Sequence, residues 1–281
     1  MSAPADRIQQ QMHELGVRPL DPGRLPPGVV VVRGLFLPSF AGPTLIELRE
    51  NGPIATLSLR GWGPDAAPLR PGFLADRHSE IAVVRRAAGT PMWRQLQGPA
   101  GPELEAAPRS GIGIDGMTVR VEVLLDGALR AVDDWSPRPG TPVHRALATL
   151  FTLASCNLRD PRSQRQLDGL QLHLEGRGSA RDRGGRPRRL RLFGDLHRYD
   201  VARLQAIADG IPPDDALLIE VEALESADDP SLAALRRIAA RPGPTAWWAG
   251  TEERAAWLRG QLPEAAVFVR LDRAMANLGG G

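Results

Sequence analysis

The stretch RRLRLFGDLHRYDVARL, residues 188–204, decides the fold expected for the second half of this chain. Residues 188–193 form an apolar, strand-like run that ends at Gly194-Asp195. Residues 201–211 then have the apolar spacing of a short helix, with Gly210 at its end. A strand that gives way to a helix after a short turn is the beginning of a β/α unit.

The sequence beyond this stretch continues the alternation of strands and helices. Apolar runs predict further strands at 216–224, 243–250 and 265–271, and helical spacing predicts helices at 231–240, 252–262 and 272–278. Upstream, GLQLHLEG at 169–176 alternates like a strand. Strands that alternate with helices of this length predict a sheet with parallel strands.

The first half has a different pattern, dominated by hairpins. Strands are predicted at 29–38 and 80–87, and hairpins at 44–62, around Asn51-Gly52, and at 117–135, around Asp126-Gly127. Residues 141–156 predict a helix that Thr141 caps and that has Pro142 in its first turn. The polar residues 157–166 predict a linker.

These patterns predict a chain of two domains, one α+β and one α/β. The first domain is an antiparallel, strand-rich unit closed by a helix, and the second alternates β-strands and α-helices. The expected division is a helix and Pro-rich segment at 1–24, the first domain at 25–158, a linker at 159–167 and the second domain at 168–279.

Residues 188–278 resemble the STAS module, the fold of bacterial anti-sigma factor antagonists. RLRLFGDLHRYDVARLQAIADGI is similar to the family's first long strand, its Gly-Glu-Leu-Asp turn and the following helix. ALLIEVEALESADDPSLAALRRIAA is similar, without a gap, to the family's strand, Asp-Ser-Ser-Gly-Leu turn and helix. The resemblance implies a non-catalytic regulatory protein that docks a protein partner.

The sequence departs from the family at the residue that the resemblance marks as the phosphoacceptor. Asp228 matches the family's Asp, Asp229 stands where the acceptor Ser would be, and Pro230-Ser231 replace the following Ser-Gly. Asp229 is either a fixed mimic of the phosphorylated state or an ordinary residue of a helix start, and Ser231 is a displaced phosphosite in a third hypothesis. The residues expected to form the partner-binding site are Asp195, His197, Asp228, Asp229 and Ser231.

Gly194-Asp195-Leu196-His197 also fits a second class of protein, the metallophosphoesterases, in which such an Asp and His hold a metal. Two-metal sites need several converging carboxylates and histidines, yet no histidine follows His197. We therefore expect no metal and no cofactor, with Asp200 capping the next helix. A hydrolase site in the first domain or at the domain junction stays the leading alternative, although nothing in the sequence fixes His78 or His144 beside other catalytic groups.

Residues 177–191 contain seven Arg and one Asp, a local charge of +6 in a chain of net charge +2. Such a segment is either a solvated hairpin loop or an anion-binding loop that attracts nucleic acid or acidic lipid. No aromatic residues interleave with these arginines, as stacking on single strands would require, so nucleic-acid binding is the third hypothesis. Its candidate residues are Arg181, Arg183, Arg186, Arg188 and Arg189.

Composition limits the remaining classes. All 35 basic residues among the 281 are Arg, and the small net charge argues against a protein that is basic over its whole surface. The single cysteine, Cys156, excludes an internal disulfide. No apolar run has the length of a signal peptide or a membrane-spanning helix, so the sequence predicts a cytoplasmic protein without membrane insertion.

Overall fold

The structure is a computed structural model. It describes residues 4–38, 42–62, 77–85, 116–125, 127–175 and 179–279. The chain divides into two compact units, which we call unit 1, residues 1–176, and unit 2, residues 177–281.

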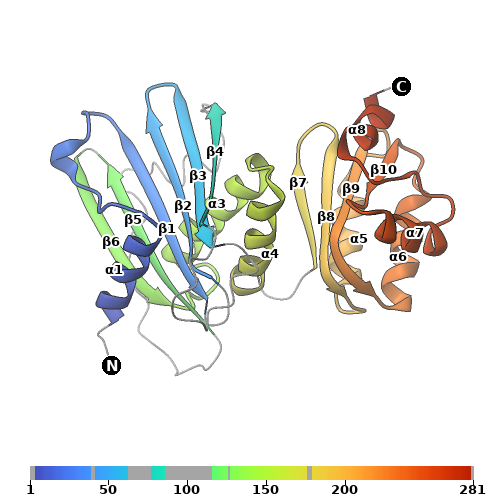
Figure 1. The fold of residues 1–281 in the computed structure, drawn as a ribbon, viewed down its shortest axis with the longest axis horizontal. Helices are drawn as coiled ribbons and strands as arrows, with labels where there is room; N and C mark the ends of the chain where they lie inside the picture. Colours follow the sequence, from blue (N-terminus) through green and yellow to red (C-terminus); the bar gives the residue numbers. More distant parts are fainter. Residues whose placement is uncertain are drawn as a thin grey trace. The chain divides into compact units, whose positions relative to one another are not determined.

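Unit 1 contains a six-stranded sheet in which every neighbouring pair of strands is antiparallel. The strands lie in the order β4-β3-β2-β1-β5-β6 (Figure 1). Their bounds are β1 Val30–Pro38, β2 Thr44–Asn51, β3 Ile54–Trp62, β4 Arg77–Arg85, β5 Met117–Leu125 and β6 Ala128–Trp135. Among the described residues, the helices of this unit are α1 Pro4–Glu14, α3 Pro142–Asn157 and α4 Pro161–Glu175, with a 3-10 turn at Pro22–Arg24.

The β2–β3 hairpin confirms the predicted pairing but moves its turn by one residue. Asn51 pairs with Ile54, so the two-residue turn is Gly52-Pro53 rather than Asn51-Gly52. Gly52 has a φ of 69°, a value that glycine adopts without the strain that other residues meet there. The β5–β6 pairing also follows the prediction, with Leu125 opposite Ala128.

Helix α3 forms where the sequence predicts it and covers one face of the sheet. The Thr141 hydroxyl accepts the His144 backbone N–H at 3.3 Å, and Pro142 occupies the first turn. A Cβ at Gly34 of β1 would lie 2.9 Å from Leu147 of α3, so the helix approaches the strand more closely than a side chain there would permit. The part of the opposite face of the sheet that includes Leu35, Leu37 and Leu45 is covered by α1 and the residues just after it.

Helix α4 corrects the prediction for residues 159–176. The polar segment expected to be a linker, and the strand expected at 169–176, belong largely to one helix, Pro161–Glu175. Leu167, Leu170 and Leu174 recur at helical spacing and enter the core of unit 1 beside α3. The strand-like alternation of Leu170, Leu172 and Leu174 was misleading because the periodicity continues upstream to Leu167.

Unit 2 has a five-stranded sheet of order β11-β10-β9-β8-β7, in which β7 is antiparallel to β8 and the other pairs are parallel (Figure 1). Together with the antiparallel sheet of unit 1, it confirms the predicted fold class. The strands are β7 Ala180–Gly184, β8 Arg188–Leu196, β9 Leu217–Ala227, β10 Thr245–Trp248 and β11 Val267–Phe268. The helices are α5 Val201–Asp209, α6 Asp229–Ala239, α7 Glu252–Gln261 and α8 Leu271–Gly279.

The helices of unit 2 are divided unequally between the two faces of its sheet. One core holds apolar residues of α5, α6 and α7 with Leu190, Ile219 and Trp247 of the strands. The opposite face carries a smaller core in which α8 packs against Leu218 and Ala246. Within the described residues, no helix combines the length and apolar character that crossing a bilayer demands.

The first strand of unit 2 lies where the sequence predicted a loop. The expected second domain began at 168 with a strand at 169–176, whereas the antiparallel first strand is β7, within the arginine-rich segment. The error arose because charged side chains in this segment masked a strand pattern.

Candidate functional site

Most of the residues predicted to bind a partner come together at the edge of unit 2 where β8 and β9 end. Because these strands are parallel neighbours, their carboxyl ends lie side by side, followed by the turns into α5 and α6. Ligand-binding crevices in open α/β sheets form at this edge where the strand order reverses. From β8 to β11 the order does not reverse, so the fold does not open such a crevice between β8 and β9.

Asp195 is positioned by an irregular end of β8. The β8–β9 register shifts between Gly194 and Asp195, and Gly194 has a φ of 59°. Bulges of this kind redirect a side chain at the end of a strand. Asp195 is exposed, and the Ser226 hydroxyl of β9 donates a hydrogen bond to its carboxylate at 2.5 Å. The two strand ends are therefore joined by a side-chain bond as well as by the backbone ladder.

Asp200 does not cap helix α5, contrary to the prediction. Its side chain makes no hydrogen bond to the helix N–H groups. Instead the buried carboxylate accepts the His197 N–H at 3.0 Å and the Ser179 N–H at 3.3 Å. Asp200 thus satisfies backbone donors of the turn before α5 and of the residue before β7, which is a structural role.

Asp228 connects the two turns of this edge. It is the N-cap of α6, where one carboxylate oxygen accepts the Ser231 N–H at 3.0 Å, and the other accepts the Arg198 N–H at 2.8 Å. The Ser231 hydroxyl lies close to the carboxylate without completing a hydrogen bond of normal geometry. The proximity of Ser231, with the two N–H bonds and nearby His197, lowers the pKa of Asp228 below its ordinary value.

Exposure separates the predicted site residues into two groups. Asp195, His197 and Asp229 are exposed, and Asp228 is partly exposed. Ser231 is fully buried, at 0% exposure. Ser231 is therefore removed from the set of partner-contacting residues and from the displaced-phosphosite hypothesis. Its burial follows from its place in the first turn of α6, on the side that packs against the sheet.

The most prominent side chains of this edge were not predicted from the sequence. Tyr199 is 67% exposed, and the Arg198 guanidinium lies 4.9 Å from the centre of its ring. An Arg198 nitrogen also donates a hydrogen bond to the Tyr199 hydroxyl at 2.8 Å. Tyr199 is the chain's single tyrosine, and its place in a turn between polar residues was the signal that could have identified it.

The arginine-rich segment is not the solvated loop that the sequence suggested. Three of its arginines form an array with two acids of β9, which we call the β8–β9 ion array: Arg183, Arg189, Arg191, Glu220 and Glu222. Arg183 donates to both carboxylate oxygens of Glu220, at 3.0 and 2.7 Å, and Arg189 donates to the same side chain at 2.5 Å. Arg191 pairs with Glu222 and lies 3.6 Å from Glu220.

Burial gives this array its electrostatic character. The side chains of Arg183, Arg191 and Glu220 are 2%, 1% and 0% exposed. Burial alone would raise the pKa of Glu220, but the surrounding arginines lower it below the ordinary value. For Glu222 burial outweighs the attraction of Arg191, and its pKa is raised. Neighbouring glutamates of one strand are thus shifted in opposite directions.

Most of the other arginines that were proposed to bind an anion are also paired or buried. Arg188 is paired with Asp182, and Arg181 is buried with its guanidinium 5.5 Å from the ring centre of Phe193. Only Arg186 of the five candidates is exposed. A signal was present in the sequence, because Arg189 and Arg191 alternate with leucines just as the two acids of β9 alternate with apolar residues. Such alternation places all four on one face of the sheet.

The histidine of β4 in unit 1 does not form a catalytic triad. His78 Nε2 lies 2.7 Å from the Ser163 hydroxyl and 3.9 Å from Asp160. A triad needs the serine and the acid on different ring nitrogens and an accessible serine, whereas both face one nitrogen here and Ser163 is fully buried. His144 contacts the Leu174 carbonyl at 2.8 Å, which ties α3 to α4.

Metal-binding geometry is also missing from the part of the chain that the structure describes. Within that part, no three His, Cys, Asp or Glu side chains gather as a metal-binding group. Asp195 is bonded to Ser226 rather than facing a cluster of acids.

The comparisons with known proteins add no relative. No family model matches the chain, and no curated protein matches it significantly.

Proposed function

We propose that unit 2 is a degenerate STAS-like module of a non-catalytic, cytoplasmic protein, and that it docks a protein partner at the β8–β9 edge. The docking surface is formed by Asp195, His197, Arg198, Tyr199, Asp228 and Asp229. The observation that carries the proposal is the exposed Arg198–Tyr199 pair at the carboxyl ends of the two strands.

The physical character of this pair supports protein binding. Tyrosine and arginine are enriched among the few residues that dominate the energy of protein interfaces. The Tyr199 hydroxyl accepts a hydrogen bond from Arg198, and its ring contacts the Arg198 guanidinium, so part of the ordering of these two side chains precedes binding. A surface ordered in advance binds with a smaller entropic cost.

The shape of the edge supports a macromolecular rather than a small-molecule ligand. Strand order does not reverse between β8 and β11, and the polar side chains of this edge bond mainly to one another or to the backbone. Asp195, for example, is engaged by Ser226, and Asp228 by two backbone N–H groups. Such an arrangement offers a firm surface and supplies no obvious activated nucleophile or general base.

The proposal is tested by site-specific photocrosslinking in cells. A photoreactive amino acid replaces Tyr199, and in a matched control it replaces Arg237, an exposed residue of α6 away from the strand ends. We expect position 199 to yield one discrete adduct whose partner, once purified, binds the wild-type chain. Tyr199→Ala should weaken that complex at least tenfold, as truncation of a central interface residue does.

The outcomes separate docking from the alternatives. Equal adducts from positions 199 and 237, or a purified partner that binds the Tyr199→Ala variant as tightly as wild type, would overturn the proposal. The hydrolase hypothesis instead predicts turnover of phosphodiester or ester substrates by the purified chain. Nucleic-acid binding predicts an affinity that falls steeply with added salt.

A further inference from the structure

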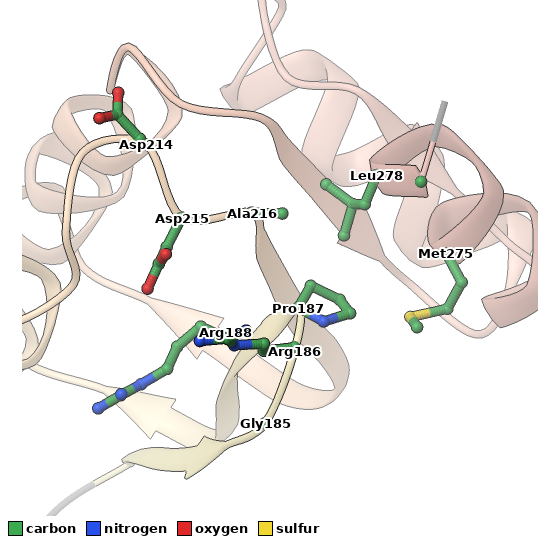
Figure 2. Close-up of a pocket in the computed structure, with 10 residues that line it drawn as sticks. Gly185, Arg186, Pro187, Arg188, Asp214, Asp215, Ala216, Met275 and Leu278 are labelled. Carbon is green, nitrogen blue, oxygen red and sulfur yellow. The ribbon is translucent and has the colours of Figure 1, made fainter. Parts of the chain in front are cut away.

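An apolar surface lies in each unit apart from the β8–β9 docking surface, and the two differ in the charges around them. In unit 2 it is a cavity of about 570 Å³ whose walls include Pro187, Met275 and Leu278 (Figure 2). Acids and arginines of balancing charge lie in or beside its lining: Asp214, Asp215, Arg186 and Arg241. The charges of this cavity therefore favour neither a cationic nor an anionic ligand.

In unit 1 the apolar surface lies on strands β3 and β4. In the part of the chain that the structure describes, half of the exposed large hydrophobic side chains are here: Ile54, Ile81 and Val83, at 52%, 66% and 70% exposure. Val83 lies opposite Thr56, and Ile81 lies opposite Ser58. Because side chains alternate along a strand, these five residues share one face of the sheet, and we call them the β3–β4 patch.

The β3–β4 patch reaches the edge of the sheet. On its inner side, Glu47 and Arg49 of β2 lie opposite Ser58 and Thr56 and are 3.7 Å apart. On its outer side, β4 is the last strand in the sheet order (Figure 1), and no other strand of the described residues pairs with its outer edge. An edge strand has backbone N–H and C=O groups without a partner strand. β4 therefore combines open hydrogen-bonding groups with an exposed apolar face.

The polar side chains of β4 do not protect this edge. Edge strands commonly avoid further pairing by presenting charges. In β4, however, the Glu80 carboxylate accepts the backbone N–H groups of Arg159 and Asp160 at 2.7 and 3.1 Å. His78 contacts the Ser163 hydroxyl at 2.7 Å and is itself buried. Both side chains are therefore bound within unit 1 and are directed away from the face that carries the β3–β4 patch.

The edge strand on the other side of the same sheet differs in this respect. β6 carries Arg130 and Asp133, both exposed, near its centre. Asp133 also lies 3.6 Å from Arg120 of the neighbouring strand β5. Exposed charges of this kind oppose extension of a sheet. Of the two edges, the β4 edge is therefore the one suited to pairing with a further strand.

We propose that β4 pairs antiparallel with β4 of a second copy of this chain. A two-fold axis perpendicular to the sheet relates the two strands, so the β3–β4 patches of both copies lie on one face. The pair is held by backbone hydrogen bonds between the strands and by apolar contact on that face. The proposal concerns unit 1 and does not depend on the docking function proposed for unit 2.

The sequence of β4 is complementary to itself in one register. Pairing about Ala82 places Ile81 of each copy opposite Val83 of the other, so both apolar residues find an apolar partner. Pairing about Glu80 would place two carboxylates opposite each other, which is unfavourable. Pairing about Ile81 would place Ser79 opposite Val83. The register about Ala82 is therefore the one that matches the exposed side chains.

The size of the contact predicts a weak dimer. The apolar part of the interface comes from Ile81 and Val83 of the two copies. A single strand pair of this kind is small compared with the roughly 1,600 Å² that a standard protein interface buries. We therefore expect the pair to form at high protein concentration and to dissociate on dilution.

The test is sedimentation velocity of the full chain over a concentration series, with amide hydrogen exchange measured at the two ends of the series. We expect a reversible equilibrium between monomer and dimer. At the high concentration, exchange of the β4 amides should slow while that of the β6 amides stays unchanged, because only β4 gains backbone hydrogen bonds.

Variants make the test specific. Ile81→Lys and Val83→Lys should each weaken the dimer about tenfold, because a symmetric pair contains each substitution twice. Leu129→Lys, which changes an exposed apolar residue of β6, is the matched control and should dimerise as wild type. All three side chains are exposed, so the unfolding temperature in dilute solution should stay close to that of wild type. If one β4 variant loses stability, the other decides.

Three results would overturn the proposal. The first is a monomer at every concentration, in which case slow exchange of the β4 amides would show that another segment of the same chain covers the edge. The second is a dimer that Leu129→Lys weakens as much as the β4 variants do. The third is dimerisation that leaves exchange of the β4 amides unchanged, which would place the contact elsewhere on the chain.

Discussion

The two units each carry an ion network on a sheet face, and the networks differ in balance and burial. In unit 1, Arg33 contacts Glu47 and Glu122, and Arg120 contacts Glu122 and Asp133. Asp133, at its margin, has a side chain that is 38% exposed. In unit 2, the β8–β9 ion array holds three arginines against two glutamates, with Glu220 at 0% exposure.

The difference shows that the same alternation of charged residues along strands leads to different energetics. At the margin of the unit 1 network, water screens the charges, and such pairs contribute little to stability. In unit 2 the charges have lost their water, so each one depends on the others. Substitutions in the β8–β9 ion array should therefore destabilise the protein more than substitutions at the margin of the unit 1 network, even though the sequence of the arginine-rich segment resembles a solvated charged loop.

The largest effect is expected when the central acid of the unit 2 array is neutralised. Glu220→Gln leaves three arginines around one uncharged side chain, and loss of one partner in a buried pair costs about 3–5 kcal/mol. The matched change in unit 1, Glu122→Gln, removes a carboxylate that is 8% exposed, but Arg33 keeps Glu47 and Arg120 keeps Asp133 as partners, so it should cost only about 1.5 kcal/mol, the scale of one charged hydrogen bond. Amide hydrogen exchange of β8–β9 and of β1–β5 measures the stability of each unit. Equal losses of stability in the two variants would contradict the expected difference between the two networks.

A smaller effect on stability is expected from glycine substitutions, which act through the backbone conformation. Gly194 has a φ of 59° at the β8 bulge, and Gly194→Ala should destabilise unit 2 by about 1–2 kcal/mol because a Cβ is strained there. Gly169, within α4 of unit 1, has open space around its Cα, and Gly169→Ala should stabilise that helix by up to about 1 kcal/mol. Chemical denaturation of the two variants should give opposite signs.

The two glutamates of β9 should respond differently to pH. The pKa of Glu220 is lowered in the folded chain, so its stabilising contribution is present above the unfolded-state pKa and is lost as pH falls through the folded-state pKa. The pKa of Glu222 is raised, so its ionisation reduces stability as pH rises through the interval between the two pKa values. Glu222→Gln should thus cost less than Glu220→Gln at pH 7, because Arg191 keeps Glu220 at 3.6 Å as a second partner. A loss as large as that of Glu220→Gln would show that the two acids are equivalent.

The smallest effect on stability is expected at Asp229, where the effect on binding is the informative one. Asp229 lies in the first turn of α6, and Asp229→Asn keeps its size while removing the anion from the positive end of the helix. Stability should fall by a few tenths of a kcal/mol. If the carboxylate mimics a phosphoryl group, affinity for the crosslinked partner should fall as well. Unchanged affinity would leave Asp229 as a residue of the helix start alone.

Much of the fold could be predicted because apolar periodicity is local. Helix α3 followed from Thr141, Pro142 and the apolar face behind them, and the β/α alternation of unit 2 followed from short apolar runs. The prediction failed in α4, where a core position at Leu167 lay inside an apparently polar linker. It failed again in β7, where Arg183 is buried against Glu220 of β9 and Arg181 is buried beside the Phe193 ring, and the sequence of β7 alone does not report these contacts.

The site was predicted less completely than the fold, for a similar reason. Asp195, His197, Asp228 and Asp229 are at or beside the ends of adjacent strands because parallel topology brings those ends together. The burial of Ser231 depends on which side of α6 meets the sheet, and the role of Asp200 depends on Ser179 in a different turn. Tyr199 became a candidate only when its exposure and its contact with Arg198 were known.

The two hydrogen bonds that Asp228 accepts affect how this edge of the sheet responds to force. One of its carboxylate oxygens holds the first turn of α6, and the other holds the backbone of Arg198 in the turn before α5. A force that lifts the Arg198–Tyr199 turn away from the sheet must first break the bond to Asp228. The carboxylate then loses one of its two anchors, so displacement of this turn is transmitted to the beginning of a helix that is remote from it in sequence.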